Sequence, residues 1–302
     1  MAELVRRIVA EDVPRIKALL QVTFGNEAYV DMKRLTGMTN RSYKITREDG
    51  TAYVLRIPGE GTEQMINRSD EKKSNELACE LGLDTSMFYF DHEGNKVMQF
   101  IESNRSVNEA LMRETMMIHK VAEVFRRLHT SSVDTGVLFE VFAMAAIYEN
   151  IIMENRVKLY PDYDKVKAQV MAVKANEDKM GRGAIVPCHN DPLPGNWILD
   201  DQEKLWLIDW EYAGMNDYIW DLACVSLECN YTEVEEKALL AAYYLREAQK
   251  EERQHFVAGK VYVDYLWFLW GLTRVPYEGE YMQEYADGRY RRLKKNLSSY
   301  VF

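Results

Sequence analysis

One stretch of the chain, residues 188–221, constrains its fold more than any other part of the sequence. It contains the pattern H-x-D-x-x-x-x-N, which begins at His189 and includes Asp191 and Asn196. Two short runs rich in β-branched and aromatic residues follow, NWIL and LWLID, and the polar stretch DDQEK between them is typical of a turn. The pattern predicts a β-hairpin that starts at Asn196 and ends at Asp209.

These residue types suit phosphoryl transfer, which requires positioning and charge neutralisation more than covalent chemistry by the protein. Asp191 is the candidate base for an acceptor hydroxyl, and Asn196 and Asp209 offer the hard oxygen ligands that Mg²⁺ prefers. Taken alone, Asp191 before a proline is also typical of a turn, and Asp209 of an exposed strand end. Together they predict a kinase-like phosphotransferase that uses ATP and Mg²⁺, with His189 bracing the loop through a backbone hydrogen bond.

Composition limits the kinds of protein that the chain can be. With 302 residues, 47% of them apolar, it is long enough for two lobes with cores of their own. Its apolar stretches are too short for a membrane span, its first residues lack the apolar segment of a signal peptide, and its four cysteines lack C-x-x-C spacing. We expect a soluble cytoplasmic protein with core thiols. The net charge of −10 argues against binding to nucleic acid or to an anionic membrane surface.

The first third of the chain predicts a small β-rich lobe. A helix is expected at about 11–22, and five strands at 29–37, 41–48, 51–57, 86–90 and 96–101. The dipeptide Asp49-Gly50 is a strong hairpin signal between two of them. A helix from about Thr62 to Leu81 lies between the third and fourth strands. We therefore assign residues 1–101 to a nucleotide-binding lobe with a five-stranded antiparallel sheet.

Several residues of this lobe are candidates for binding ATP. The turn between the first two strands can lay backbone N–H groups against phosphates, although an ordinary hairpin turn has the same composition. Its candidates are Gly37, Thr39, Asn40 and Ser42. Arg56 on the third strand is expected to bind the α- and β-phosphates, and Glu71 to pair with Arg56, with Glu76 as the second choice. Gln99 and Ile101 would offer backbone groups to adenine.

Beyond residue 101 the pattern changes to helices. They are expected at 107–130, 137–159, 163–178, 217–229, 232–249, 252–273 and 279–298. Residues 102–302 are therefore assigned to a larger, mainly helical lobe for catalysis and acceptor binding. The predicted fold class is α+β, with the bilobal architecture of protein kinases. The sequence lacks the pattern G-x-x-x-x-G-K-[ST], which disfavours a P-loop NTPase.

Longer stretches of the sequence strongly resemble the choline/ethanolamine kinases, particularly those of bacteria, and the resemblance covers nearly the whole chain. It rests on LTGMTNRSYKI, YVLRIPG, INRSDEKKSNELACELGLD, CHNDPLPGNWILD and LIDWEYAGMNDYIWDLACVSLE. The H-x-D-x-x-x-x-N pattern alone is shared with aminoglycoside kinases and other small-molecule kinases. The discriminating parts are therefore INRSDE, IDWEYAGMND and WDLA. Arg56 stands where many relatives have Lys, and choline kinases with either residue are known.

The resemblance implies a site for a quaternary ammonium, which has no N–H to donate and is held by aromatic faces and carboxylates. Trp267 and Trp270 lie on a common face of a late helix and resemble the aromatic pair of the family. Periodicity alone favours a role for both tryptophans in the apolar core over a role in ligand binding. Glu228 corresponds to the acidic partner of this pair, and Asp221 is interpreted as a brace for the catalytic loop. Further candidates for the cage are Glu211, Tyr212, Tyr231 and Tyr285.

We therefore predict transfer of the γ-phosphoryl group of ATP to the hydroxyl of choline, and three alternatives stay open. An ethanolamine kinase is the nearest, since ethanolamine would form hydrogen bonds to the carboxylates. An aminoglycoside or thiamine phosphotransferase is the second, and the pair Trp267 and Trp270 argues against the open acidic groove of an aminoglycoside enzyme. A nucleotide-binding pseudokinase is the third, and the intact set of Asp191, Asn196 and Asp209 argues against it. The sequence leaves the oligomeric state open.

Overall fold

A computed structural model describes most of the chain, namely residues 8–35, 37, 40–59, 66–103 and 105–301. The chain divides into two compact units. Unit 1 comprises residues 1–106 and 197–212, and unit 2 comprises residues 107–196 and 213–302. The sequence-based division after residue 101 did not assign residues 197–212 to the N-terminal lobe. They belong to unit 1 because Leu207 donates its backbone N–H to the carbonyl of Leu83, and Ser103 its hydroxyl to the carbonyl of Leu199.

Unit 1 is built on a five-stranded sheet in the order β1-β2-β3-β5-β4, and all neighbouring strands are antiparallel. The strands are β1 (Asp31–Arg34), β2 (Arg41–Thr46), β3 (Ala52–Ile57), β4 (Met87–Phe90) and β5 (Lys96–Gln99). The predicted sheet is therefore confirmed. Gly50 has a φ of +82°, a left-handed conformation that glycine adopts without a steric penalty, so it suits the tight turn between β2 and β3.

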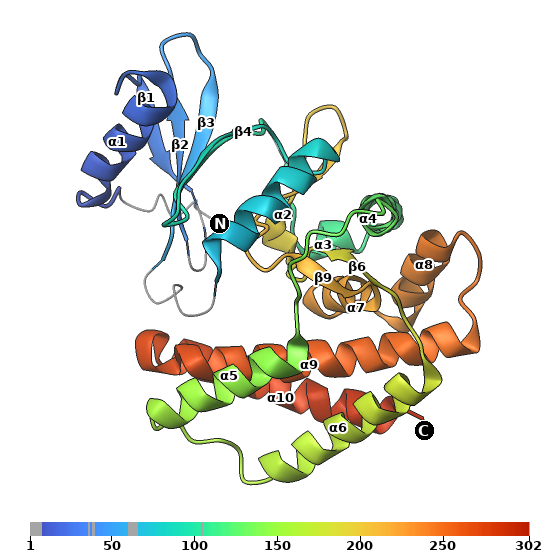
Figure 1. Cartoon of the computed structure of the whole chain (residues 1–302). Coiled ribbons are helices and arrows are strands. Elements are labelled where there is room, and N and C mark those ends of the chain that lie inside the picture. Colours follow the sequence, from blue (N-terminus) through green and yellow to red (C-terminus); the bar gives the residue numbers. More distant parts are fainter. Residues whose placement is uncertain (1–7, 36, 38–39, 60–65, 104, 302) are drawn as a thin grey trace. The chain divides into compact units, whose positions relative to one another are not determined.

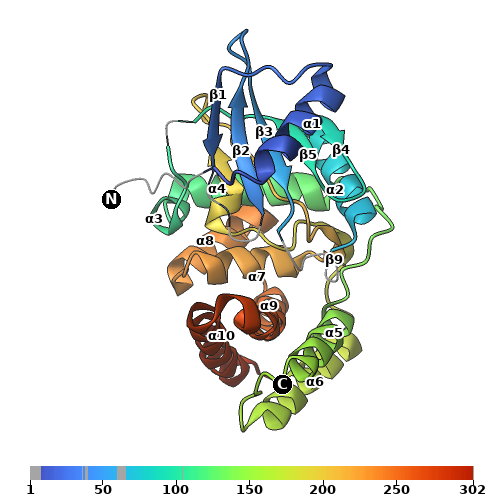
Figure 2. The ribbon, with the colours of Figure 1, turned by 90° about the vertical axis from the view of Figure 1, so that its left-hand side faces the viewer.

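Helix α1 (Asp12–Phe24) covers one face of this sheet, as Figure 2 shows. Its apolar residues recur at helical spacing, so one stripe faces the strands. Ile16, Leu19 and Leu20 of this stripe form a buried cluster with sheet residues that include Leu55 and Val97. This packing fixes the orientation of β3, the strand that carries Arg56.

Helix α2 (Arg68–Glu80) lies between β3 and β4 in the chain and begins later than the sequence predicted. Its first turn is capped by Asn67, whose side-chain oxygen accepts a hydrogen bond from the backbone N–H of Ser69. Asn is a favoured N-cap residue because its side chain satisfies a free N–H of the first turn. The part of the predicted helix at residues 62–65 lies outside the described residues.

The predicted hairpin is also present in unit 1. It consists of β7 (Trp197–Leu199) and β8 (Leu205–Leu207), which pair antiparallel with Trp197 opposite Leu207. The side chains of both residues are buried. The hairpin leads directly into Asp209, which places this carboxylate at the end of a well-packed element.

Unit 2 is mainly helical, as predicted. Its helices are α3 (Glu109–Met112), α4 (Thr115–His129), α5 (Val141–Glu154), α6 (Tyr163–Met180), α7 (Ile219–Glu228), α8 (Glu233–Tyr244), α9 (Lys250–Glu278) and α10 (Glu280–Ser299). The helix expected at 107–130 is interrupted between α3 and α4. A short antiparallel pair, β6 (Ile185–Cys188) and β9 (Gly214–Asp217), was not predicted. It flanks the loop that carries Asp191.

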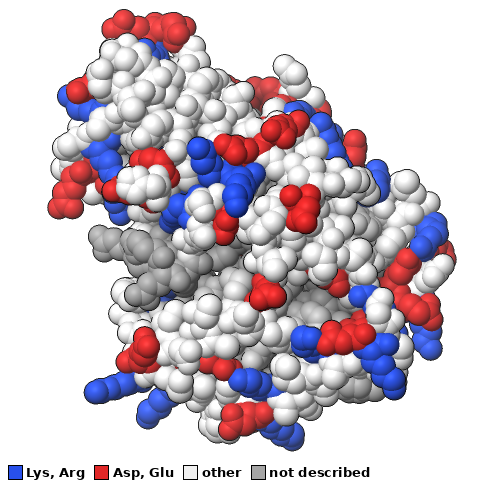
Figure 3. All heavy atoms as spheres, viewed as in Figure 1, with Lys and Arg blue, Asp and Glu red and all other residues white. Residues whose placement is uncertain are grey.

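Helix α9 is the central element of unit 2 and runs alongside α10 (Figure 1). It is 29 residues long, and most of its residues are buried. A Cβ atom on Gly259 would lie 3.0 Å from the Cβ of Ala223, so this glycine allows α7 to approach α9 closely. Within the described residues, no helix combines the length and the apolar character that a membrane crossing requires. On the face drawn in Figure 3, acidic and basic side chains are interspersed.

Candidate active site

The centre of the candidate nucleotide site in unit 1 is an ion pair between β3 and α2. Arg56 is only 3% exposed and Glu71 only 1%, and Nη1 of Arg56 lies 2.5 Å from Oε1 of Glu71. Arg56 also donates through Nη2 to the carbonyl oxygen of Gly94, at 2.8 Å. Glu76, the second choice from the sequence, instead lies on the exposed side of α2 at 3.9 Å from Lys72. The partner of Arg56 is therefore Glu71.

Two further cations surround Glu71, and the sequence analysis named neither of them. Nζ of Lys96 lies 3.6 Å from Oε1 of Glu71, and Nη1 of Arg68 lies 2.7 Å from Oε2. Burial by itself raises the pKa of Glu71, but the charges of Arg56 and Lys96 outweigh it and lower that pKa to about 2. Arg56 and Lys96 are cross-strand partners on β3 and β5, a register that the structure shows and the sequence alone did not. Two like charges directly opposite each other require a shared counter-ion.

Lys96 is held in place by a buried polar network behind this ion pair. Its ammonium donates to the side-chain oxygen of Asn75, at 3.1 Å, and the amide of Asn75 donates to Asp84, also at 3.1 Å. Burial raises the pKa of Asp84 to about 6, although the positive charge of Lys96 opposes this rise. The network connects α2 and β5, and it holds Lys96 at Oε1 of Glu71, the same oxygen that Arg56 contacts.

Asp209 and Glu211 lie beside Arg56, also within unit 1. Oδ1 of Asp209 is 3.3 Å from Nη1 of Arg56, and Oε2 of Glu211 is 3.3 Å from Nη1 of Arg68. Carboxylate oxygens of Glu71, Asp209 and Glu211 lie within 4.8 Å of one another. Asp209 has a φ of +66°, an uncommon conformation outside glycine that tends to occur at functional sites. Glu71 and Glu211 already contact arginines, so the partly exposed Asp209 is the carboxylate of this group that offers hard oxygens to a divalent cation such as Mg²⁺.

Glu211, an acceptor candidate from the sequence, lies beside the arginines of the candidate nucleotide site. It accepts a hydrogen bond from the side chain of Asn40, at 2.9 Å, and faces the two arginines. Burial, together with the neighbouring charge of Asp209, raises the pKa of Glu211 to about 7. Nothing in the sequence separated this role from the predicted one, because Glu211 is only two positions from Asp209. Tyr212, another acceptor candidate, is half-buried at the end of the same segment.

The other nucleotide candidates of unit 1 fall into three groups. Thr39 lies outside the described residues. Asn40 is buried. The backbone of Gly37 approaches that of Asn40 so closely that a Cβ atom on Gly37 would lie 2.8 Å from the carbonyl oxygen of Asn40. Ser42 pairs with Arg56 across β2 and β3. Gln99 and Ile101 line a pocket of about 620 Å³.

The backbone of Gln99 is engaged within unit 1, contrary to its predicted role at adenine. Its N–H donates to the carbonyl of Ser86, and its carbonyl accepts from the hydroxyl of Thr85. Its side-chain amide donates to the carbonyl of Ala52. These bonds occupy the backbone groups of Gln99, whereas the role of Ile101 at adenine stays a prediction.

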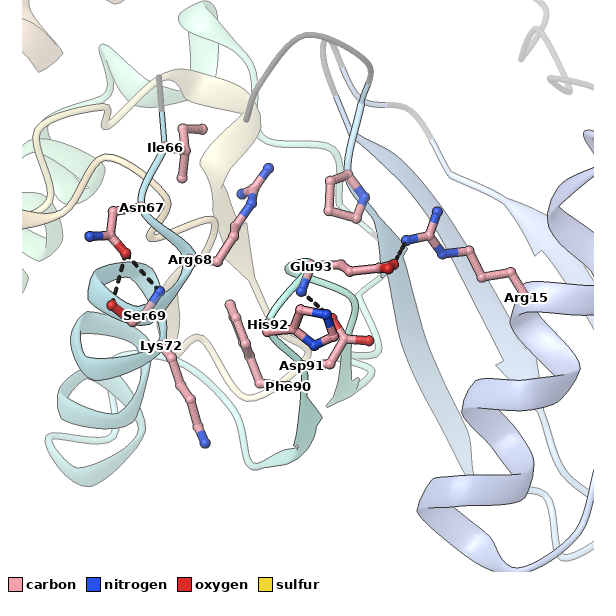
Figure 4. Close-up of a pocket in the computed structure, with 11 residues that line it drawn as sticks. Arg15, Ile66, Asn67, Arg68, Ser69, Lys72, Phe90, Asp91, His92 and Glu93 are labelled. Atoms are coloured by element: carbon pink, nitrogen blue, oxygen red, sulfur yellow. Dashed lines mark hydrogen bonds and ion pairs between the residues drawn. The ribbon is translucent and has the colours of Figure 1, made fainter. Parts of the chain in front are cut away.

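A second pocket of unit 1, of about 860 Å³, lies at the N-terminal end of α2 beside the turn between β4 and β5 (Figure 4). Figure 4 shows the ion pair between Arg15 and Glu93 on its wall, and the hydrogen bond from Ser69 to the cap residue Asn67. Arg68 also lines it and is ion-paired with Glu71. Arg15 is therefore compensated by Glu93 on the wall itself, and Arg68 by Glu71, which does not line the pocket.

The loop that carries Asp191 belongs to unit 2 and is fixed by Asp221, as the sequence predicted. Asp221 is fully buried, and its two oxygens accept the backbone N–H groups of His189 and Asn190, at 2.8 and 2.7 Å. His129 contacts the same carboxylate through Nε2, at 3.1 Å. Asn190 adopts a left-handed conformation with a φ of +67°. Asp191 directly follows this turn.

Asp191 is itself positioned by two neighbours. Nδ1 of His189 accepts the backbone N–H of Asp191 at 3.2 Å, which confirms the predicted bracing role of His189. The side-chain amide of Asn196 donates to the carbonyl of Asp191, at 2.8 Å, and lies 3.4 Å from its Oδ2. Asp191 is half-buried, so its carboxylate is held by the loop and still accessible.

The aromatic candidates form a buried corner between α9 and α10. The ring centroids of Trp267 and Trp270 are 6.0 Å apart at an interplanar angle of 88°, and Tyr285 stands 5.8 Å from Trp270. Tyr285 can approach because α9 has no side chain at Gly271, where a Cβ atom would lie 2.8 Å from its ring. Nε1 of Trp270 has no hydrogen-bond partner among the described residues.

Tyr148 of α5 is a further polar group of unit 2 that the sequence analysis missed. It is 1% exposed, and its hydroxyl has no hydrogen-bond partner among the described residues. Burial, with the charge of Asp191 as the second cause, raises the pKa of Tyr148 well above its usual value. A buried hydroxyl that lacks a partner is rare in proteins, and it indicates a place where a ligand or a water molecule binds.

Two acceptor candidates have partners that the sequence did not reveal. The hydroxyl of Tyr231 donates to the backbone carbonyl of Met112, at 2.7 Å, which ties this residue to α3. Glu228 forms an ion pair with Arg289 of α10. Both partners are distant in sequence, and no spacing rule identifies them.

Comparisons with known proteins identify the family of the chain. The model of the choline/ethanolamine kinase family matches residues 32–271. Protein LicA of Haemophilus influenzae strain Rd is 30% identical over 271 residues, which cover 85% of this chain and 99% of that protein. The crystal structure of choline kinase LicA from Streptococcus pneumoniae has a TM-score of 0.83 at 31% identity and covers 96% of this chain and 100% of that one. A LicA structure in complex with AMP has a TM-score of 0.81 at 31% identity, with 95% and 98% covered.

Proposed function

The chain belongs to the choline/ethanolamine kinase family of ATP-dependent phosphotransferases, and on this premise we propose that it transfers the γ-phosphoryl group of ATP to the hydroxyl of choline. One observation supports choline as the acceptor above the others. The aromatic corner of Trp267, Trp270 and Tyr285 lies in the same unit as the candidate base Asp191. Aromatic faces are what a protein offers to a quaternary ammonium, because that group cannot donate a hydrogen bond.

In the proposed reaction Asp191 orients the choline hydroxyl and accepts its proton as the bond to phosphorus forms. The carboxylate can do so because Asn196 and His189 fix its loop, while Asp221 holds the two preceding backbone N–H groups. The product is phosphocholine, and ADP leaves with the β-phosphate oxygen that was bonded to the γ-phosphorus. The half-buried position of Asp191 keeps it reachable for the acceptor.

We assign the binding of the phosphates to Arg56. The carboxylates around it orient Arg56 or are candidates for holding the metal ion. Glu71 and the carbonyl of Gly94 orient Arg56. Its guanidinium is therefore held in a fixed position before any ligand binds. Asn196 and Asp209 are the residues that would hold Mg²⁺. When bound, this ion neutralises the charge on the phosphate oxygens. Glu211 is a further candidate, since its carboxylate oxygen lies within 4.8 Å of that of Asp209.

Ethanolamine is the nearest alternative acceptor, and other small alcohols are more distant ones. The proposal is tested by the release of ADP from ATP and Mg²⁺ in the presence of choline, ethanolamine, thiamine or kanamycin. We expect the highest kcat/KM with choline. A higher value with ethanolamine would assign the other activity of the family, and a higher value with kanamycin would indicate an antibiotic kinase. ATP binding without turnover on any of the four would favour a pseudokinase.

Replacing Trp270 by Ala tests the aromatic corner directly. A desolvated contact between a cation and an indole ring contributes about 2 kcal/mol or more, so we expect the KM for choline to rise by about tenfold to a hundredfold. The KM for ATP should stay unchanged. Trp270→Phe is the matched control, because it keeps an aromatic face and should recover most of the affinity. An unchanged KM for choline in the Ala variant would mean that Trp270 has a purely structural role.

A further inference from the structure

Glu228 is not a free carboxylate, although the resemblance to the family predicted it as the partner of the acceptor cation. It is 13% exposed at its side chain and forms an ion pair with Nη2 of Arg289, whose side chain is 4% exposed. The guanidinium of Arg289 also lies 4.9 Å from the ring centroid of Tyr285. A protein cation therefore already stands at the carboxylate and beside one aromatic wall of the corner.

Arg289 is itself fixed by a second carboxylate. Its Nη1 lies 3.3 Å from Oδ1 of Asp264, which is fully buried on α9. Asp264 also accepts hydrogen bonds from Arg292, at 2.7 Å, and from the amide of Asn296, at 2.9 Å. The group as a whole contains two carboxylates and two guanidiniums, so its charges balance.

A group of side chains whose charges balance is expected to bind choline and ethanolamine with different affinities. A quaternary ammonium loses little binding free energy beside a neutralised carboxylate, since aromatic faces rather than hydrogen bonds hold it. A primary ammonium must find hydrogen-bond acceptors when it leaves water, because an unsatisfied buried donor is costly. Oε1 of Glu228, the carboxylate that the family resemblance assigns to the acceptor cation, is already bonded to Arg289. A primary ammonium would therefore have to compete with a guanidinium that Asp264 holds in place.

We propose that Arg289 is a specificity-determining residue, which neutralises Glu228 and so favours choline over ethanolamine. This inference rests on the proposed function, since it concerns the acceptor of the same site. Arg289 acts through Glu228 and Tyr285. Its role is therefore to position and neutralise, and it takes no part in the chemical step.

The first experiment measures the KM for choline in Glu228→Gln and in the double variant Glu228→Gln with Arg289→Met. Removing one partner of a buried ion pair leaves the other charge uncompensated, so the single variant should raise the KM by about tenfold or more. The double variant removes that stranded positive charge and should return the KM to within about threefold of the wild-type value. If Glu228 instead supplied the counter-charge for choline, the double variant would be as impaired as the single one, and the proposal would be wrong.

The second experiment measures the ratio of kcat/KM for choline to that for ethanolamine in Arg289→Met. Without Arg289, the carboxylate of Glu228 can accept a hydrogen bond from the primary ammonium of ethanolamine. We therefore expect the ratio of kcat/KM for choline to that for ethanolamine to fall by about tenfold. Arg292→Met is the matched control, since Arg292 bonds Asp264 but not Glu228, and its ratio should stay unchanged. Equal changes in both variants, or none in Arg289→Met, would overturn the proposal.

The outcome for the wild-type protein separates this inference from the function on which it rests. Absence of turnover with both choline and ethanolamine in the wild type would reject the proposed function itself. Normal turnover without rescue in the double variant would reject only the role of Arg289. Thermal unfolding of each variant shows whether it is folded, and Arg289→Lys, which keeps the charge, should retain the wild-type ratio.

Discussion

Replacing Asp191 by Asn is expected to lower kcat with choline by about a thousandfold, while the affinity for ATP changes by less than about threefold. The reason is chemical, since Asn has nearly the same shape as Asp but cannot accept a proton. The loop should survive the change because its anchors are Asp221 and the backbone groups of His189 and Asn190. Steady-state kinetics give kcat, and calorimetric titration with ATP gives the affinity.

Asp164→Asn provides the control for this experiment, because Asp164 is an exposed carboxylate in the first turn of α6. It should leave both quantities unchanged. If Asp191→Asn retained kcat, another group would have to accept the hydroxyl proton, and the assigned mechanism would be contradicted. A loss of ATP affinity equal to the loss of kcat would mean that Asp191 supports the nucleotide site instead.

Replacing Glu71 by Gln is expected to lower the free energy of unfolding by about 3 kcal/mol, because it removes the carboxylate shared by three cations. Arg56, Arg68 and Lys96 all lie within ion-pair distance of this carboxylate, and each is largely buried. The loss should be accompanied by a raised KM for ATP, since Arg56 loses the group that orients it. Urea unfolding at pH 7 measures the stability.

The pH dependence gives the same prediction a second test. The pKa of Glu71 is lowered from 4.5 to about 2 in the folded protein, so its contribution is fully present above pH 4.5 and is lost as the pH falls towards 2. The difference in stability between wild type and Glu71→Gln should therefore narrow by about 1 kcal/mol between pH 7 and pH 4. Glu76→Gln on the same helix is the control, and its exposed pair with Lys72 should contribute less than about 0.5 kcal/mol. Equal effects of the two substitutions would contradict the buried network.

The sequence predicted most of the fold, because the signals for it are local. Alternation and the Asp49-Gly50 turn identified the sheet, and H-x-D-x-x-x-x-N with two short apolar runs identified the loop and hairpin around Asp191. Asp221 was correctly interpreted as a brace. The start of α2 was placed too early because helical periodicity continues upstream of Asn67, whereas the cap depends on one side-chain hydrogen bond.

The parts that the sequence missed depend on contacts between distant residues. Lys96 stabilises Glu71 only because β5 pairs with β3, and Glu211 contacts Arg68 only because the hairpin packs within unit 1. The pair of Glu228 and Arg289 joins α7 to α10 across 61 positions of the chain. No local spacing rule predicts such a pair. For this reason the acceptor residues were less predictable than the residues around Asp191.

The phosphorus NMR spectrum of wild-type protein with ATP, Mg²⁺ and choline tests the central claim most directly. We expect the γ-phosphate signal of ATP to decrease while phosphocholine and ADP appear in equal amounts, and the reaction to stop when choline is omitted. Consumption of ATP to ADP and inorganic phosphate at the same rate with and without choline would contradict the account. An unchanged ATP spectrum in the presence of choline would contradict it as well.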